Sequence, residues 1–565
     1  MDMRKTILLF VLLLAGIVQA ANLPKEVVKA RRSVATVLAY KGGNLLGSCT
    51  AVFVGEKGDL LASNPLFATA DSAVAIDNAG KVHKVGRISG ASDVYGCVKL
   101  RVAWNKKIKP MAVSVSKVNA GDELFLLSYG VKKGGFAEPV KVVKVDSVYS
   151  CAYYTLAVPM QEKFNSLPVV NSSGELVAIM QPASASDTVN SYAIGAAVVE
   201  KMNVTSANYG RGYLPGTAIR ACLPESSAEA LSCLYMQAIV GDSVTYKSVI
   251  DEFIEKFPDN YEGFMAKAEY TAVYYRDIDA AYKVWEEALS LADNKAEVYF
   301  GRGKVMNSIV QSGDTVSHPI LSFENALADI EKAIAVDNQP LYLSYKADML
   351  FAHKDYASAA ECYEALAATN MRSVALFSKA SQCYGELKEY DKAVAMLDSV
   401  VGMLGSFPKQ AAPYILTRAL VKSNAGRYRD AVQDYVEYES IVGNIQNAEF
   451  FYLREQAELN GKMYQQALND IETAIYLAPE NPLYYIEKGM LCYRVKMYDE
   501  GIRALDKARE LAPSSPDVYY LLGRLYVQKG DKATAKENFG KALSLGHPDA
   551  EKQLKTGNTI IRLWI

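Results

Sequence analysis

The chain has 565 residues, half of them hydrophobic and 22% charged. Its 61 basic and 63 acidic side chains leave a formal net charge of −2. Because nucleic-acid binding needs an excess of basic side chains to neutralise phosphates, this balance argues against a nucleic-acid-binding protein. The length allows several ordinary domains, or fewer if one of them is an extended repeat array.

The N-terminus has the pattern of a secretory signal peptide. Arg4 and Lys5 give a basic start, an apolar run follows from Ile7 to Ile17, and the pattern ends at Ala20. The run is too short for a comfortable membrane span, and no later segment is apolar for long enough to cross a bilayer. We therefore expect residues 1–20 to be removed after Ala20 and the mature protein to be soluble, in the periplasm or secreted. An uncleaved anchor is the alternative.

Residues 21–203 contain many short apolar or alternating runs, separated by turn residues such as Gly42, Gly43 and Gly55. This arrangement is typical of an all-β barrel or sandwich. The predicted strands run from Val34 to Tyr40, Ala51 to Val54, Leu60 to Ala62, Ala73 to Ile76, Val98 to Val102, Glu123 to Leu127 and Leu156 to Val158.

Segments of this region resemble the trypsin-like serine proteases of bacteria. The stretch from Gly47 to Val54, followed by Gly58 to Asn64, is similar to the family's opening strand and to the turn before its catalytic histidine. Ser166 to Ile179 resembles the stretch around the nucleophilic serine, and Gly121 to Leu124 resembles a strand of the second barrel. The resemblance implies a trypsin-like double β-barrel over residues 21–203.

The residues at the family's catalytic positions do not support its chemistry. Acyl transfer by a serine requires a base within hydrogen-bond reach and a carboxylate that orients the base. The histidine position falls at Pro65 or Leu66, and no histidine occurs between residues 21 and 82. His83 lies too far along the chain, and we expect it to be a solvated strand residue. The acid position holds Gly96, three residues after Asp93.

The nucleophile position is altered as well. It falls at Asn165, with Ser166 one place off, and Lys163 and Leu167 replace the glycines that shape the family's oxyanion hole. We therefore predict a pseudoprotease without catalytic residues. The alternative is an active serine endopeptidase in which Ser166 uses Lys163 as its base.

Two further segments lie outside the predicted domains. Residues 204–224 include Gly210, Gly216 and Pro224, which indicates a linker. Residues 551–565 form a tail with an apolar end, and we expect it to fold back over the last repeat. Addition of the tail to a partner's sheet is the alternative.

Eight cysteines in an exported chain permit disulfides. Cys222 and Cys233 are close enough in sequence to pair across a turn. Cys362, Cys383 and Cys492 lie in helical patterns and are expected to be free core residues. Because the chain contains no C-x-x-C pair, we expect no structural zinc site, and we expect no other metal and no cofactor.

The C-terminal two thirds of the chain repeats at about 34 residues. The repeated positions are Ala467, Gly501 and Ala535, then Ile471, Leu505 and Phe539, and then Ala474, Ala508 and Ala542. These residues are similar to the tetratricopeptide repeat (TPR), in which each unit is a helical hairpin whose small residues let the two helices approach closely. With weaker units upstream, the resemblance implies an all-α superhelical solenoid of about eight or nine hairpins over residues 225–550.

Stacked hairpins form one continuous core and an extended concave surface. In the TPR family the first helix of each unit lines this groove, which holds extended peptides or partner helices. By phase from Gly489 and Gly523, the inward positions of the last three units include Tyr452, Gln456, Ile486, Met490, Tyr520 and Arg524. Aromatic and arginine side chains are common hot spots of protein interfaces. Each of these residues could instead simply cover the core.

The leading hypothesis is therefore an exported scaffold or adaptor that binds a protein or peptide partner in its groove. The pseudoprotease domain would supply a second interaction surface. One alternative is the active endopeptidase, with the repeats as a substrate-recruiting arm. Another is a structural subunit of a cell-envelope assembly.

Overall fold

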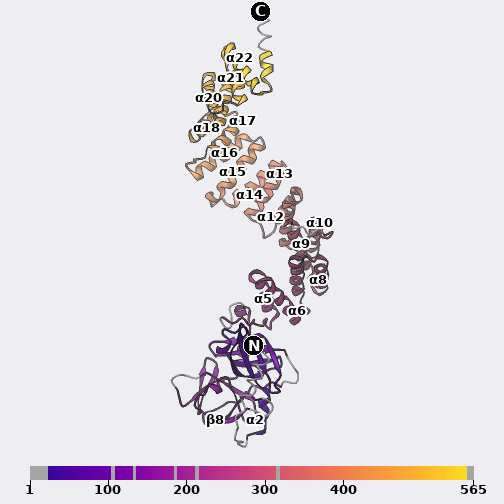
Figure 1. Cartoon of the computed structure of the whole chain (residues 1–565). Coiled ribbons are helices and arrows are strands. Elements are labelled where there is room, and N and C mark those ends of the chain that lie inside the picture. Colours follow the sequence, from indigo (N-terminus) through magenta and orange to yellow (C-terminus); the bar gives the residue numbers. More distant parts are fainter. Residues whose placement is uncertain are drawn as a thin grey trace, which may run out of the picture. The chain divides into compact units, whose positions relative to one another are not determined.

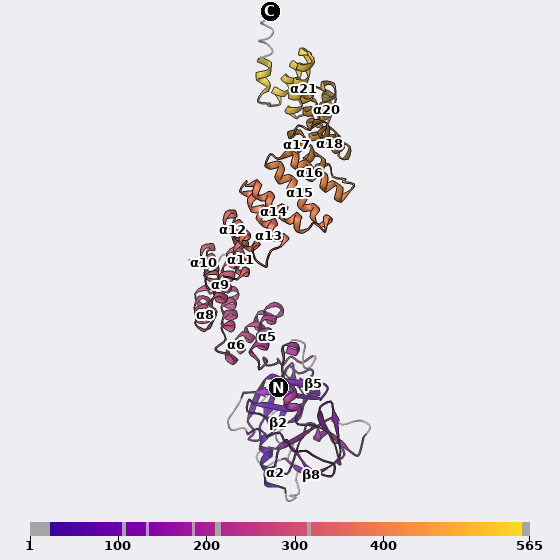
Figure 2. The ribbon, with the colours of Figure 1, turned by 180° about the vertical axis from the view of Figure 1, so that it is seen from behind.

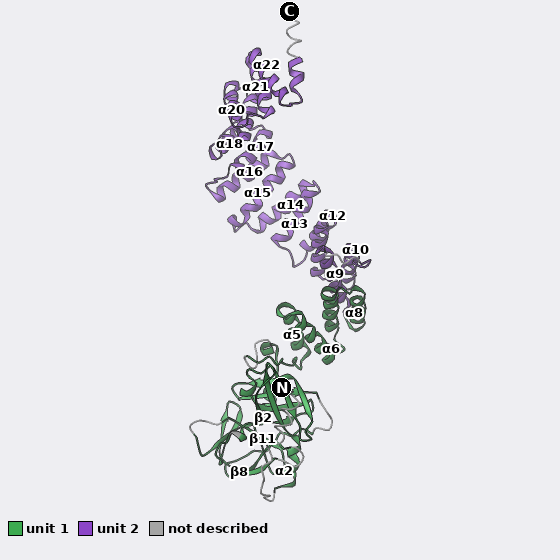
Figure 3. Cartoon of the chain, in the orientation of Figure 1, with its two compact units in different colours: residues 1–293 green, residues 294–565 purple. Residues whose placement is uncertain are grey.

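The computed structural model of the protein describes residues 23–103, 109–130, 135–182, 187–209, 216–313 and 318–555. The chain divides into two compact units, residues 1–293 and residues 294–565 (Figure 3). The predicted signal peptide, the middle of the predicted linker and residues 556–565 of the predicted tail lie outside the described residues.

Unit 1 opens with a short helix and two closed antiparallel barrels of six strands each (Figure 1). The helix is α2 (Lys25–Ala30). The first barrel has the strand order β1-β2-β3-β6-β5-β4 and consists of β1 (Val34–Lys41), β2 (Asn44–Val54), β3 (Asp59–Ser63), β4 (Ser72–Ile76), β5 (Val82–Ser92) and β6 (Cys97–Val102). The second has the order β10-β11-β12-β9-β8-β7 and consists of β7 (Glu123–Leu127), β8 (Ala137–Val148), β9 (Cys151–Leu156), β10 (Pro168–Val170), β11 (Leu176–Met180) and β12 (Ser191–Gly195).

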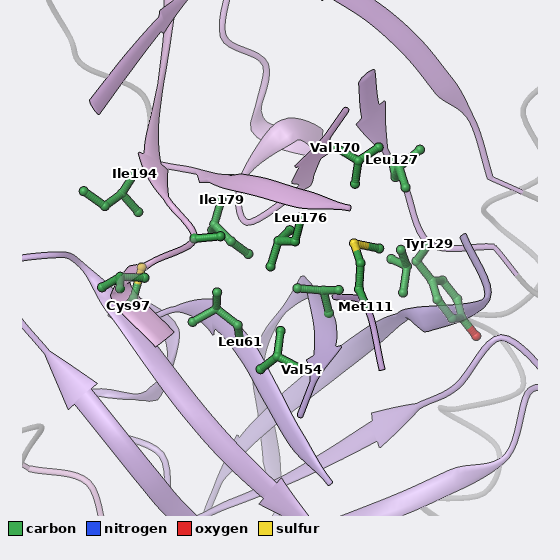
Figure 4. Close-up of a cluster of buried hydrophobic side chains, with 14 of the residues drawn as sticks. Val54, Leu61, Cys97, Met111, Leu127, Tyr129, Val170, Leu176, Ile179 and Ile194 are labelled. Atoms are coloured by element: carbon green, nitrogen blue, oxygen red, sulfur yellow. The ribbon is translucent and has the colours of Figure 1, made fainter. Parts of the chain in front are cut away.

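Each barrel has a core of its own, and a third cluster of buried side chains joins them. Val54 and Leu61 of the first barrel face Leu176 and Ile179 of the second (Figure 4). All four side chains are at most 1% exposed. Strands such as β1 are therefore buried on both faces, which explains their continuous apolar runs.

The chain that follows the second barrel returns to the first. Helices α3 (Val198–Lys201) and α4 (Ser206–Tyr209) come first. The described end of the predicted linker then lies along β5, where the Ile88 amide donates to the Arg220 carbonyl and the Cys222 amide donates to the Ile88 carbonyl, both at 2.8 Å. This part of the predicted linker is packed against the barrel.

The rest of the described chain is a series of helical hairpins. Two lie in unit 1, α5 (Ser227–Val240) with α6 (Ser243–Lys256), and α7 (Tyr261–Tyr270) with α8 (Ile278–Leu291); α7 ends in a π-helical turn, η4 (Thr271–Tyr275). Unit 2 contains α9 (Lys295–Gln311), α10 (Phe323–Val336), α11 (Pro340–Ala352), α12 (Tyr356–Ala367), α13 (Val374–Glu386), α14 (Tyr390–Met403), α15 (Pro408–Asn424), α16 (Tyr428–Val442), α17 (Ala448–Asn460), α18 (Tyr464–Leu477), α19 (Pro482–Arg494), α20 (Tyr498–Leu511), α21 (Pro516–Lys529) and α22 (Lys532–Ser544) (Figure 2).

The eighteen helices from α5 to α22 make nine hairpins within the described residues. The fold class predicted from the sequence, a double β-barrel followed by an all-α helical solenoid, is confirmed.

Small residues hold the hairpins together as the repeat pattern predicts. A Cβ atom added at Gly489 in α19 would lie 2.6 Å from Leu505 in α20. One added at Gly523 in α21 would lie 2.7 Å from Phe539 in α22. Both distances are far below van der Waals contact, so only glycine permits these helices to approach so closely.

Three hairpins also contain a buried ion pair at one equivalent position. Arg302 pairs with Asp329 across α9 and α10, and its Nη2 donates at 3.1 Å. The matching Nη2 atoms donate at 2.8 Å in the hairpins α15–α16 and α17–α18, in the pairs Arg418–Asp434 and Arg454–Asp470. Each arginine directly precedes the small-residue position of its first helix, and each aspartate directly precedes the large residue of the second helix.

Candidate functional site

The region between the two barrels holds the residues that the protease resemblance singled out. Ser166 lies between β10 and the short helical turn at Glu162–Phe164, and its side chain is fully buried. Its Oγ accepts a hydrogen bond of 2.7 Å from the Ser63 amide at the end of β3, and it also hydrogen bonds the Cys49 thiol. Burial raises the pKa of that thiol to about 12. The hydrogen-bond partners of this hydroxyl among the described residues are thus a backbone amide and a thiol.

The nearest analogue of a base and its orienting acid in this region is an amide with a carboxylate. Asn64 Nδ2 donates to Asp93 Oδ1 at 2.9 Å, and Asn64 directly follows Ser63. A side-chain amide can orient a neighbour, but it cannot accept a proton at ordinary pH. At the predicted acid position, Gly96 has φ +61°, and a Cβ atom there would lie 2.6 Å from Gln181 Oε1. A side chain at this position would therefore require a strained left-handed backbone and a shift of the Gln181 side chain.

His83 lies on a strand, as expected, but the prediction that it is solvated is wrong. The side chain on β5 is buried, and its Nε2 lies 2.9 Å from Asp77 Oδ2. Asp77 also accepts hydrogen bonds from the amides of Ala79 and Lys81, both at 2.9 Å. The aspartate shapes the turn between β4 and β5, and the imidazole covers it. No sequence pattern indicates this pair, because the two residues are brought together only by the β4–β5 register.

Lys163, the alternative base, is exposed and lies over aromatic rings. Its Nζ is 5.0 Å from the centre of the Phe164 ring and 5.3 Å from that of Phe136. Among the described residues there is no hydrogen bond between Lys163 and Ser166. Asn165, at the predicted nucleophile position, has a buried Oδ1 that accepts no hydrogen bond from any described residue.

The six predicted groove residues all lie on first helices and are all half-buried. Tyr452 and Gln456 are on α17, Ile486 and Met490 on α19, and Tyr520 and Arg524 on α21. Residues of this set contact neighbouring first helices. The Tyr452 ring lies 5.6 Å from that of Tyr484 on α19.

The α21 pair also makes contacts within the array. Tyr520 stacks on His547 with ring centres 3.9 Å apart. Arg524 Nη2 donates to the Tyr493 hydroxyl at 2.8 Å, and the guanidinium lies 4.5 Å from the centre of that ring. These contacts hold the side chains in fixed positions, which lowers the entropy that a partner's binding would have to remove. The use of the six residues in binding stays a prediction.

A cluster of buried carboxyl groups lies beside Gln456. Glu455 on α17 is fully buried; its Oε2 accepts from Gln456 Nε2 at 2.7 Å, and its Oε1 has no partner among the described residues. Gln456 also hydrogen bonds Glu487 of α19. Glu458 is 3% exposed and lies near Asp470, which Arg454 already neutralises.

Burial is the main cause of the high pKa values in this cluster. It raises the pKa of Glu455 to about 8, with a further contribution from the neighbouring Glu487. The pKa values of Glu458 and Glu487 are raised for the same reason, and that of Glu458 also by the charge of Asp470. One feature of the sequence indicates this cluster: Glu455 lies 34 residues before Gly489, at a position where the repeat normally has a small residue.

A hollow in the hairpins lies on the second helix α16. It has a volume of about 530 Å³ and is lined by Arg429, Val432, Gln433 and Val436 of α16, with Met463. None of the six predicted groove residues lines it.

The eight cysteines are buried free thiols. Cys222 and Cys233, for which pairing was an open alternative, therefore form no disulfide, and Cys362, Cys383 and Cys492 lie in helices as predicted. Among the described residues, three or more His, Cys, Asp or Glu side chains nowhere come together in a way that could hold a metal ion. No helix of the described chain combines the length and hydrophobicity that crossing a bilayer requires.

The comparisons with known proteins bear on both parts of the chain. The family model of the tetratricopeptide repeat matches residues 516–545. No curated protein matches the sequence. Among solved structures, a serine endoprotease from Yersinia pestis is 13% identical, with a TM-score of 0.29, over 32% of this chain and 66% of that one, just under two thirds of its length.

Two helical proteins are similar to other parts of the chain. YrrB, described as a TPR protein with an unusual peptide-binding site, is 20% identical with a TM-score of 0.30, over 35% of this chain and 99% of its own. MamA from Desulfovibrio magneticus RS-1 is 24% identical with a TM-score of 0.28, over 30% of this chain and 94% of its own. The hairpin α21–α22 is thus a tetratricopeptide repeat, in a chain that joins two six-stranded barrels to a series of helical hairpins.

Proposed function

We propose that this protein is a protein-binding scaffold whose first helices, from α17 to α21, form the binding groove. The observation that carries the proposal is the series of nine hairpins, in which all six predicted groove residues lie half-buried on first helices. An extended peptide or a partner helix fits the aromatic and arginine side chains of such a surface.

Site-specific photo-crosslinking tests the groove. A benzophenone amino acid replaces Tyr452 or Tyr520 in the full chain, which preserves most of the aromatic volume at each site. The control replaces Tyr476, which is 83% exposed on the second helix α18. We expect the same partner to be crosslinked from the two groove positions and not from Tyr476. Equal crosslinking from Tyr476, or none from the groove positions, would contradict the proposal.

We infer that the double barrel has no peptidase activity and serves as a second interaction surface. The support is local: Ser166 is buried, its hydroxyl accepts from a backbone amide, and no histidine occurs between residues 21 and 82 of the sequence. A fluorophosphonate probe tests the inference in wild type and in Ser166→Ala. Labelling of the wild type that is lost in the variant would restore the endopeptidase hypothesis.

We also propose that the protein is exported and acts in the periplasm or outside the cell. The sequence pattern of residues 1–20 supports export, and an exported scaffold suits a cell-envelope assembly or a soluble adaptor equally. N-terminal sequencing of the mature protein tests export, with Ala21 as the expected first residue. A mature chain that begins at Met1 would place the scaffold on the membrane or in the cytoplasm. Copurification with a membrane protein at fixed stoichiometry would favour the structural subunit.

A further inference from the structure

A polar cavity lies in unit 1, where the first barrel meets the segments that follow the second barrel. Its volume is about 190 Å³. The walls come from β3, β5 and β6, together with residues 203–204 and 222–225. At ~30 Å³ for each water in the liquid, this volume equals about six water molecules and exceeds the size of a four-oxygen anion.

Lys99 of β6 lines this cavity and is only 7% exposed. Its Nζ donates to the Val199 carbonyl at 2.9 Å and to Asn203 Oδ1 at 3.4 Å. Both acceptors are neutral, and no carboxylate of the described residues forms an ion pair with Lys99. An ammonium has three donors, so one remains for a further acceptor.

The other charges around the cavity are paired. Arg101 donates to both oxygens of Asp59, at 2.9 and 3.1 Å. The Glu225 carboxylate forms ion pairs with Lys57 at 2.7 Å and with Lys256 at 3.1 Å. The lining residues thus include three cations, Lys57, Lys99 and Arg101, against the two carboxylates of Asp59 and Glu225, an excess of one positive charge.

Burial of an unpaired ammonium is unfavourable, and it lowers the pKa of Lys99 despite the nearby charges of Asp59 and Glu225. A bound anion would remove this penalty, because it would supply both the missing acceptor and the missing charge.

We propose that this cavity is a binding site for a small oxyanion, a phosphate or a carboxylate, held by the ammonium of Lys99 beside the Arg101 guanidinium. The site belongs to the folded state because its walls come from strands and from segments that follow them by about a hundred residues. The anion therefore stabilises the junction of the barrel with residues 203–225 by mass action.

Titration calorimetry on the full chain, in a buffer without other oxyanions and at constant ionic strength, tests the proposal with inorganic phosphate and acetate in separate experiments. We expect saturable binding of at least one of them to the wild type. Lys99→Met should weaken it by at least about tenfold, which corresponds to ~1.4 kcal/mol. The control is Lys84→Met, on the exposed side of β5, with unchanged affinity.

A second pair of variants keeps the test decisive if Lys99→Met does not fold. Val204 lines the same cavity, and Val204→Asp places a carboxylate there that takes the anion's role. Val204→Asn introduces a side chain of the same shape as aspartate but without its charge. We expect Val204→Asp to abolish binding and Val204→Asn to retain it. The proposal is overturned if the wild type binds neither anion up to about 10 mM, or if binding is the same in Val204→Asp and Val204→Asn.

Discussion

The carboxyl group of Glu455 should make the stability of the α17–α18 hairpin depend on pH. Its pKa is about 8 in the folded protein against an ordinary value of 4.5, so folding takes up a proton between these two pH values. Stability is therefore highest below about pH 4.5 with respect to this group, and it falls as the pH rises towards 8. At pH 7, about 2.5 pH units above the ordinary value, the loss amounts to about 3 kcal/mol.

Glu455→Gln removes this titration and keeps the oxygen that accepts from Gln456. We expect the variant to stabilise the hairpin by about 1 to 3 kcal/mol at pH 7, because the unpartnered amide N–H of the new side chain offsets part of the gain. The control, Glu480→Gln, changes an exposed carboxylate in the turn after α18 and should have no measurable effect.

Hydrogen exchange over α17 and α18, corrected for the intrinsic rate at each pH, measures the opening free energy of this hairpin alone. A local measurement is needed because a repeat array does not unfold in two states. The wild type should lose protection between pH 5 and pH 8, and Glu455→Gln should lose less, because only Glu458 and Glu487 still titrate there. Equal slopes in the two proteins would show that Glu455 is ionised in the folded state and would refute the reasoning.

Three further predictions concern packing and buried charge. Gly523→Ala should destabilise its hairpin by about 1 to 3 kcal/mol, because the new Cβ atom overlaps the facing phenylalanine. At Gly540 a new Cβ atom meets nothing within 4 Å, so Gly540→Ala should stabilise α22 by about 0.5 to 1 kcal/mol. Hydrogen exchange over α21–α22 measures both effects. Arg302→Met should lower the stability of α9–α10 by about 3 to 5 kcal/mol, and adding Asp329→Leu should restore most of the loss, as hydrogen exchange over α9–α10 in both variants would reveal. Ser166→Ala should cost about 1 to 3 kcal/mol in the melting of the barrels because a buried amide loses its acceptor; an unchanged melting temperature would disprove that hydrogen bond.

The sequence predicts this fold well where a pattern repeats or a strand is buried on both faces. The 34-residue spacing of Gly489 and Gly523 sets the phase of the last hairpins, and the apolar run of β1 is a strand of a two-sided core. Strands β8 and β12 were not predicted. In β8 valines alternate with charged residues because one face is exposed, and β12 is only five residues long.

Most features of the candidate sites depend on contacts between residues that are distant in the sequence or lie in different secondary-structure elements. The absence of histidine between residues 21 and 82 is readable from the sequence alone. The burial of His83 depends on the register of β4 and β5, and the Lys99 cavity needs residues more than a hundred positions apart. The buried carboxyl of Glu455 is the intermediate case, since its repeat position marks it as unusual but only packing shows that its Oε1 has no hydrogen-bond partner among the described residues.

The Arg–Asp pairs also affect which helices pair with each other when a chain of similar hairpins folds. The positions equivalent to Asp329, Asp434 and Asp470 hold Cys362, Ala504 or Asn538 in other hairpins. If Arg302 docked on one of those second helices, it would be buried without this aspartate, a penalty of about 3 to 5 kcal/mol. Arg418 and Arg454 also donate to Asp398 and Glu439, so their loss would be smaller. The three pairs should therefore disfavour the pairing of a first helix with the wrong second helix during folding.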